Sequence, residues 1–151
     1  MRIVRADPDD AAALTEIAFT AKRHWRYPER WIESWRDILT VTPQLIAANP
    51  TFSAMEDNRI VGFYSLTTEP HPDLTHLWVL PRAMGQGIGR ALFGHAAGQA
   101  KALGFRGFRI EADPNAEGFY QRMGAKRAGS NRTEVEGEVR ELPLLRYDLE
   151  P

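Results

Sequence analysis

The chain lacks cysteine and long hydrophobic runs, and neither sign of charge dominates it. Without cysteine it cannot form a disulfide, a thiolate zinc site or a cysteine nucleophile. No apolar run approaches the ~20 residues that span a bilayer. The first ten residues turn polar by residue 5, where a signal peptide would have its apolar core. We therefore expect a cytoplasmic protein without a membrane partner.

The charge balance also argues against a nucleic-acid partner. The chain has 19 basic and 20 acidic residues and a net charge of −1, whereas nucleic-acid binding usually requires a basic face. We predict no metal site. The 151 residues suit a single domain, residues 1–151, because a chain of this length buries a core without disulfide or metal staples.

The first third of the chain predicts one short strand followed by helices. Residues 2–6 have the pattern of a strand, and Asp7 with Pro8 forms a helix start signal. The next helix has an apolar face with Leu14 and Ile17. A second helix follows residue 30, and a further turn is predicted over 42–49. The apolar stripe of the second helix consists of Trp31, Ile32, Trp35, Ile38 and Leu39.

The remainder predicts strands that alternate with two helices. Strands over 51–57 and 59–68 flank a hairpin signal. Residues 73–80 form a third strand that is apolar on both faces at its end, which is typical of a central strand. The later elements are a helix ended by Gly104, a strand over 107–113, a short helix over 115–123 and a last strand over 139–149.

This order mixes hairpins with crossover connections. We therefore predict an α/β (α+β) fold with a central mixed, mostly antiparallel twisted sheet of six to seven strands, flanked by about four helices. Pro143 within the last strand indicates an edge position or a bulge, because proline cannot donate to a neighbouring strand. His76 shares an alternation phase with Leu74 and Trp78, so these three side chains are expected on one face of the central strand.

Three glycines, Gly85, Gly87 and Gly89, join the central strand to the following helix. Such a junction exposes free backbone N–H groups at a helix N-terminus, where phosphate commonly binds. A P-loop requires Lys followed by Ser or Thr, whereas this chain has Arg90 and Ala91. A dinucleotide loop requires G-x-G-x-x-G/A, and that pattern fails from both possible starting glycines.

The segment VLPRAMGQGIGRAL resembles the acyl-CoA loop of the GNAT superfamily of N-acetyltransferases. Val79, Pro81, Gly87 and Gly89 match its pattern, and Met84 departs from it, because the family usually has Arg or Gln there. The later segment IEADPNAEGFYQRMGA is similar to the family's next block. The resemblance covers most of the chain and is strongest over residues 74–124. It implies a GNAT-like fold and acetyl transfer from acetyl-CoA to a primary amine of a small molecule or peptide.

The same resemblance implies how CoA binds. It places the CoA arm along the central strand at Leu77, Trp78 and Val79, in a splay between two strands of the sheet. It places the pyrophosphate on the loop and helix start, at Gly85, Gln86, Gly87, Ile88, Gly89 and Arg90. Asn115 either holds the CoA arm or caps the short helix. Tyr120 occupies the position of a tyrosine that protonates the CoA thiolate, and the alternative is a half-buried core aromatic.

The reaction also needs a group that takes a proton from the amine, because a free alkylamine has a pKa near ~10.4. Glu111 lies at the strand position that serves as the base in some family members, although an ion pair with Arg109 explains it nearly as well. His76 is a rival base, since histidine titrates near neutral pH, with a structural histidine as the alternative. A water chain is the third route for the proton.

The acceptor side is predicted from a basic and aromatic segment, residues 22–27. We predict that His24, Trp25 and Tyr27 bind the acceptor, which favours an amine that also carries a carboxylate or phosphate. The alternative is a solvated face with Trp25 in the core. The polar residues 130–142 are interpreted as a loop over the acceptor.

Two other functions remain open, and the chain is compatible with a homodimer. A non-catalytic acyl-CoA-binding or sensor module would keep the glycine loop without the chemistry. A nucleotide-phosphate protein is disfavoured by the missing Lys-Ser/Thr pair.

Overall fold

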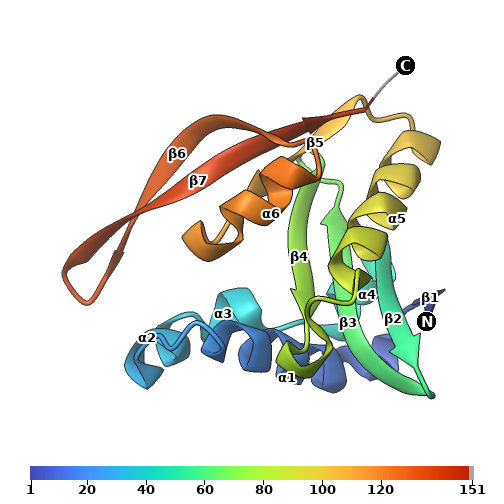
Figure 1. Cartoon of the computed structure of the whole chain (residues 1–151), viewed down its shortest axis with the longest axis horizontal. Coiled ribbons are helices and arrows are strands. Elements are labelled where there is room, and N and C mark those ends of the chain that lie inside the picture. The colour runs from blue at the N-terminus through green and yellow to red at the C-terminus, as the bar shows by residue number, and fades with distance from the viewer. Residues whose placement is uncertain (150–151) are drawn as a thin grey trace.

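The computed structural model describes residues 1–149, and its centre is a seven-stranded sheet in the order β1-β2-β3-β4-β5-β7-β6 (Figure 1). Neighbouring strands are antiparallel except β4 and β5, which are parallel. The predicted mixed, mostly antiparallel sheet is confirmed, and β4 takes the middle position. The strands are β1 (Arg2–Arg5), β2 (Thr51–Glu56), β3 (Arg59–Thr67), β4 (Asp73–Val79), β5 (Gly107–Glu111), β6 (Lys126–Val135) and β7 (Glu138–Asp148).

Helices cover both faces of the sheet. One face carries α1 (Ala11–Arg23), α2 (Glu29–Ser34), α3 (Arg36–Leu39) and α4 (Pro43–Ala48), and the other carries α5 (Ile88–Ala102) and α6 (Glu117–Arg122) (Figure 1). Asp7 caps the turn before α1 as predicted, with its side chain accepting a hydrogen bond from Asp9 N–H. No helix within residues 1–149 is long and apolar enough to cross a membrane.

The described helices are more numerous than predicted because the helix expected after residue 30 breaks at Trp35. This residue has φ −95° and ψ 10°, outside helical geometry, and separates α2 from α3. The break changes the direction in which the following side chains point. Ile38, predicted on the apolar stripe, is consequently 70% exposed, whereas Ile32 and Leu39 are buried.

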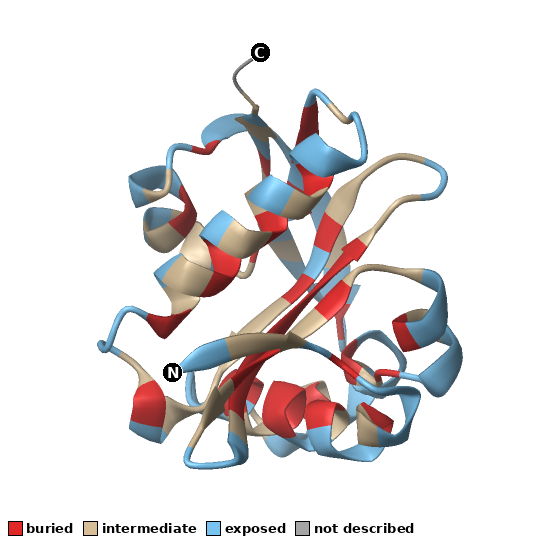
Figure 2. Ribbon diagram, turned by 90° about the vertical axis from the view of Figure 1, so that its right-hand side faces the viewer, coloured by how far each residue is buried: buried red, intermediate tan, exposed pale blue. Residues whose placement is uncertain are grey.

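Two hydrophobic cores lie on the two faces of the sheet, and buried residues concentrate on the middle strands and on the sheet-facing sides of the helices (Figure 2). The core beneath α5 and α6 contains Tyr64, Leu92 and Phe108. The core beneath α1 contains Leu14 and Phe63.

A register shift in β4 separates His76 from Leu74. Ser65 of β3 pairs with His76 but the next residue, Leu66, pairs with Leu74, so Thr75 is an extra residue on β4. Such a bulge reverses the alternation of side chains. Leu74 therefore lies in the core beneath α5, while Trp78 packs against the core beneath α1 and His76 contacts Phe63 on that face. The expectation that Leu74 and His76 share a face is wrong.

The polar residues 130–142, predicted as a loop, instead form most of a long hairpin of β6 and β7. Glu136 and Gly137 make its two-residue turn with φ of 48° and 82°, the positive values that tight hairpins require.

Strand β7 lies inside the sheet, so the edge predicted from Pro143 is wrong for the strand as a whole. Pro143 is tolerated because its nitrogen faces the side where β5 has already ended at Glu111.

Candidate functional site

The two parallel strands at the centre of the sheet separate soon after they meet. They pair only where Asp73 faces Arg109, and towards Val79 no strand within residues 1–149 pairs with β4 on its β5 side. Leu80 N–H donates to the Val61 carbonyl of β3. Because backbone groups alternate in direction along a strand, the N–H and C=O groups of Leu77 and Val79 face the opening. The splay expected from the family resemblance is present.

A groove of about 450 Å³ follows this opening. Its walls come from β4, from the glycine loop and start of α5, and from the end of β5 and the start of α6. Most of the predicted CoA-binding residues lie together here: Leu77, Trp78, Val79, Gly85, Gly87, Ile88, Gly89, Arg90, Asn115 and Tyr120. Gln86 is the exception, because its exposed side chain lies at a separate surface hollow beside Arg59 and Arg82.

The glycine loop leaves backbone N–H groups free at the start of α5. The first hydrogen bond of this helix runs from Ala91 N–H to the Gly87 carbonyl at 3.0 Å, and within residues 1–149 no side chain caps the helix. The N–H groups of Ile88, Gly89 and Arg90 therefore lack helical partners. They point out of the helix N-terminus, where its dipole favours an anion.

The three glycines serve different local needs. Gly85 and Gly87 have φ of 78° and 82°, a conformation that other residues adopt only at a cost. Gly89 has no such φ, and a side chain there would lie 3.3 Å from the Phe119 ring. Met84, which departs from the family pattern, lines the groove beside Gly85.

Tyr120 lines the groove from α6 and is 7% exposed. Burial, together with the negative charge of Asp113, raises the pKa of its phenol far above the usual value. The phenol is therefore protonated at neutral pH, and its hydroxyl has no hydrogen-bond partner in the described part of the chain. Its ring also packs against Phe93 and Phe119, so the core reading and the proton-donor reading are both compatible with this geometry.

Glu111, the last residue of β5, is not paired with Arg109. The Arg109 Nε donates to Asp73 Oδ1 at 3.0 Å instead. Glu111 Oε2 accepts a hydrogen bond from Asn131 Nδ2 of β6 at 2.6 Å, and the side chain lines the groove. Sequence reasoning missed Asn131, because the segment that carries it was interpreted as a loop.

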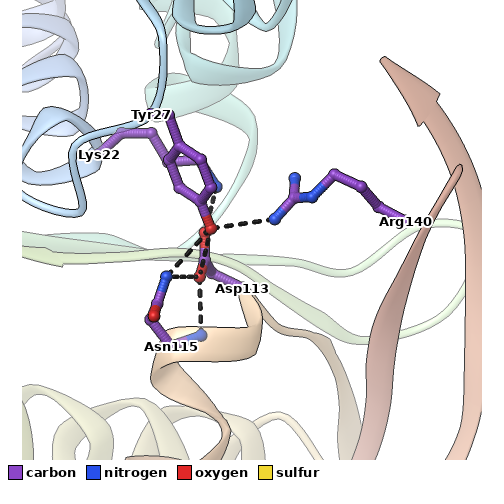
Figure 3. A network of polar contacts seen from close by, with 5 residues as sticks. All are labelled: Lys22, Tyr27, Asp113, Asn115 and Arg140. Carbon is purple, nitrogen blue, oxygen red and sulfur yellow. Dashed lines mark hydrogen bonds and ion pairs between the residues drawn. The ribbon is translucent and has the colours of Figure 1, made fainter. Parts of the chain in front are cut away.

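A partly buried polar network joins four segments near the end of the groove (Figure 3). Lys22 Nζ of α1 lies 2.5 Å from Asp113 Oδ2, with both side chains about nine-tenths buried. Tyr27 donates its hydroxyl to Asp113 and accepts hydrogen bonds from Arg140 of β7 and from Asn115, both at 3.0 Å. Asp113 and Asn115 also line the groove.

Of the predicted acceptor residues His24, Trp25 and Tyr27, only Tyr27 belongs to this network. Asn115 is not a cap: Asp113 caps the single turn Pro114–Ala116 that leads into α6, by accepting from Asn115 N–H at 2.8 Å. Tyr27 is held by the network. Trp25 lines the CoA-side groove at 39% exposure, so it is not a core residue. His24 packs against Trp25 and is not among the residues that line the groove.

Charge inside the network is balanced by pairing. Burial would raise the pKa of Asp113, but the charge of Lys22 and hydrogen bonds from Lys22, Asn115 and Tyr27 outweigh it, and the pKa is lowered. Burial raises the pKa of Tyr27 to about 12, with Asp113 adding to the shift. The network therefore holds an ionised Asp113 and a protonated Tyr27 phenol.

A second cavity of about 420 Å³ lies on the side of the splay nearest α3. It shares Leu74, Thr75 and Glu111 with the groove, so the two cavities meet at the end of β5. His76 also lines this cavity, at 5% exposure, and burial lowers its pKa to about 4.

Comparisons with known proteins agree with this geometry. Residues 31–140 match the family model described as acetyltransferase (GNAT) domain. A stretch of 97 residues, 64% of the chain, is 39% identical to the peptidyl-lysine N-acetyltransferase YjaB of Salmonella typhimurium. The match spans 62% of that protein, which is less than two thirds of its length.

Solved structures share the fold over nearly the whole chain. A GCN5-related N-acetyltransferase from Rhodopseudomonas palustris is 24% identical with a TM-score of 0.78, covering 98% of this chain and 95% of that one. PaiA N-acetyltransferase from Thermoplasma acidophilum, in complex with coenzyme A, is 19% identical with a TM-score of 0.74, covering 97% and 98%. YncA from Salmonella typhimurium, with acetyl-CoA, is 20% identical with a TM-score of 0.70, covering 100% and 95%.

Proposed function

Because the chain belongs to the GNAT family of acetyltransferases, we propose that it transfers the acetyl group of acetyl-CoA to a primary amine. Two of the similar structures contain coenzyme A or acetyl-CoA, which supports acetyl-CoA as the cosubstrate. The 39% identical relative is a peptidyl-lysine N-acetyltransferase. A lysine side chain in a peptide context is therefore the first acceptor to test.

One observation carries the proposal: two cavities meet at the splay and share Leu74, Thr75 and Glu111. The groove connects the free N–H groups at the start of α5 with the unpaired backbone of β4 and ends beside Glu111. The second cavity reaches Glu111 from the side of α3. A thioester in the groove and an amine in the second cavity would therefore meet at the opening in the sheet.

The chain's own groups fit a CoA thioester. The N–H groups of residues 85–90 bind the pyrophosphate, and the backbone of Leu77 and Val79 pairs with the amide-bearing arm as a neighbouring strand would. Asn115 and Arg90 lie along the same groove and complete the contacts. Acetyl-CoA supplies the electrophilic carbonyl carbon, and a β4 N–H group donates to the carbonyl oxygen as charge develops on it.

Two side chains move protons in this proposal. Glu111 takes a proton from the amine, directly or through a water, while Asn131 orients its carboxylate. Tyr120 is protonated and lines the groove, so it donates a proton to the departing thiolate. The Tyr120 assignment rests on its position and its protonation state, and the Glu111 assignment rests on its position in the groove and its contact with Asn131.

The test is thiol release from acetyl-CoA across a panel of amines, with CoA binding measured separately by calorimetry. Acetyl transfer to at least one amine, with product mass increased by one acetyl group, supports the proposal. Tight CoA binding without thiol release on any amine would instead identify the non-catalytic CoA-binding module. Stabilisation by ATP but not by CoA would overturn both readings.

A further inference from the structure

The second cavity at the splay is lined by carboxylates, one guanidinium, one histidine and three threonine hydroxyls. Residues from α3, β4 and β5 line it: Asp37, Thr40, Thr67, Asp73, Thr75, His76, Arg109 and Glu111 are its polar members. Its volume of about 420 Å³ suits a small ligand or one side chain of a larger one. On the proposed function, this is where the acceptor amine enters.

The charge of this cavity favours a cation. Three carboxylates against one guanidinium leave a formal charge of −2 with His76 neutral. Arg109 is already paired with Asp73 at 3.0 Å, so it has little attraction left for a ligand anion. Asp37 is exposed on α3, and Glu111 has one oxygen held by Asn131 and the other free of any hydrogen bond within residues 1–149. A ligand ammonium would meet these two carboxylates.

His76 adds a directed hydrogen-bond donor to the same cavity. Its Nδ1 accepts a hydrogen bond from the Trp78 indole N–H at 3.0 Å. An indole nitrogen can only donate, so Nδ1 of His76 carries no hydrogen, and in the neutral ring the hydrogen is on Nε2. The ring is 5% exposed and lines the cavity, and its Nε2 has no partner in the described part of the chain.

This tautomer also removes His76 as a base. Nδ1 is occupied by Trp78 and Nε2 already bears a hydrogen, so neither nitrogen of the neutral ring can take a proton from the amine without breaking this arrangement.

The three threonine hydroxyls of the cavity do not compete for the donor role. Thr40, Thr67 and Thr75 each donate to a backbone carbonyl of the chain itself.

We propose that the cavity selects a primary amine that carries a neutral oxygen acceptor, such as an amide carbonyl, and no carboxylate. Asp37 and Glu111 attract the ammonium group, and His76 Nε2–H donates to the neutral oxygen. The same carboxylates repel an acidic substrate. The assignment rests on the proposed function. It differs from the sequence-based expectation of an acceptor with a carboxylate or phosphate, because no residue of 22–27 lines this cavity and Lys22 is paired with Asp113 in the network of Figure 3.

A set of amines that differ in one feature tests the proposal at saturating acetyl-CoA. N-acetyl-lysine methylamide has one primary amine and neutral carbonyls, N-acetyl-lysine adds a carboxylate, and n-pentylamine has no oxygen. We expect kcat/KM to be highest for the methylamide, about tenfold above pentylamine, as one net hydrogen bond predicts. A higher kcat/KM for N-acetyl-lysine than for its methylamide would overturn the proposal. Alaninamide and a short lysine peptide then distinguish a free small molecule from a peptide acceptor.

Two substitutions of His76 test its role in selection. In His76→Asn the side-chain oxygen can still accept from Trp78, but the donor at the Nε2 position is lost. In His76→Gln the amide N–H₂ lies near the Nε2 position and restores a donor. In the wild type we expect kcat/KM for the methylamide to be about tenfold above that for pentylamine. We expect His76→Asn to make the two kcat/KM values about equal, mainly through KM. We expect His76→Gln to recover part of the wild-type preference for the methylamide. An equal loss on both amines would mean a structural role and refute the assignment.

Asp37→Asn should raise KM for the cationic amines, and Asp9→Asn, an exposed change outside both cavities, is its matched control. Equal KM values for the two variants would remove Asp37 from the site.

Failure of the acceptor assignment is distinct from failure of the proposed function. If no amine releases thiol, the enzyme proposal fails, whereas thiol release without these preferences refutes only the acceptor assignment.

Discussion

A pair of glycine substitutions within one helix and its preceding loop tests the conformation of the CoA loop. Gly87 precedes α5 with φ of 82°, and no atom lies within 4 Å of the position where a Cβ would be placed. Gly94 lies in the middle of the same helix, is exposed, and also has free space around its Cβ position. Replacing each by alanine adds the same methyl group, so the change in the unfolded chain is the same in both variants.

The two variants should move stability in opposite directions. Alanine at Gly87 is forced into the left-handed region, at a cost of ~1–2 kcal/mol, which corresponds to a fall in melting temperature of roughly 2–8 °C for a chain of this size. Alanine at Gly94 gains helix propensity of about 1 kcal/mol, which corresponds to a rise of roughly 2–4 °C. Thermal unfolding monitored by circular dichroism measures both shifts.

A third variant, Gly87→Val, tests CoA contact at the same position. Gly87→Val adds bulk at the helix N-terminus where we place the pyrophosphate, and we expect its CoA affinity to fall at least tenfold by calorimetry, while Gly94→Ala binds CoA as the wild type does. A Gly87→Ala protein as stable as Gly94→Ala would refute the backbone argument. A Gly87→Val protein with unchanged CoA affinity would refute the phosphate site.

Three further predictions concern proton transfer and the buried network. Tyr120→Phe keeps the ring packing and should lower kcat roughly a hundredfold with little change in calorimetric CoA affinity; an unchanged kcat would leave Tyr120 as a core aromatic. Glu111→Gln keeps an oxygen for Asn131 and should also lower kcat roughly a hundredfold, with activity partly recovered at high pH as the amine loses its proton; a wild-type pH–rate profile would assign the proton to a water chain. The lowered pKa of Asp113 means that its pairing with Lys22 stabilises the fold above the carboxyl's unfolded pKa near 4 and is lost as pH falls through the lower folded value. Asp113→Asn should therefore flatten the acid limb of stability measured by urea unfolding, and an acid limb identical to that of the wild type would contradict the assignment.

The features that were predictable from sequence are those with local causes. Alternation and three-to-four spacing identified six of the seven strands, all except β6, and α5, because side-chain periodicity follows directly from backbone geometry. The glycine loop was recognisable for a similar reason, since Gly85 and Gly87 have backbone angles that favour glycine. By contrast, one extra residue at Thr75 reversed the face on which His76 lies. The turn at Glu136 was missed because glutamate is an uncommon residue at positive φ.

The pairings within the site could not be predicted because they join distant parts of the chain. Glu111 and Asn131 are 20 residues apart, Arg109 and Asp73 are 36 apart, and Lys22 and Asp113 are 91 apart. Each pairing depends on which strands become neighbours, and the order β4-β5-β7-β6 is not the order of the sequence. The sequence shows which side-chain types occupy these positions, but it does not show which residues they pair with.

The network of Figure 3 shows how the cations beside the groove are neutralised. Arg140 stacks over Tyr27 and Trp35 at 4.9 and 5.0 Å from the ring centroids, and Lys22 lies 4.4 Å from the centroid of Trp35. These cations are thus occupied by aromatic faces and by Asp113, because a buried charge without partners would be strongly unfavourable. They hold α1, the segment before α2, and β7 around the end of the groove. On the acceptor assignment proposed above, the carboxylates of Asp37 and Glu111 are the unpaired charges of the second cavity among the described residues, which suits a cationic amine.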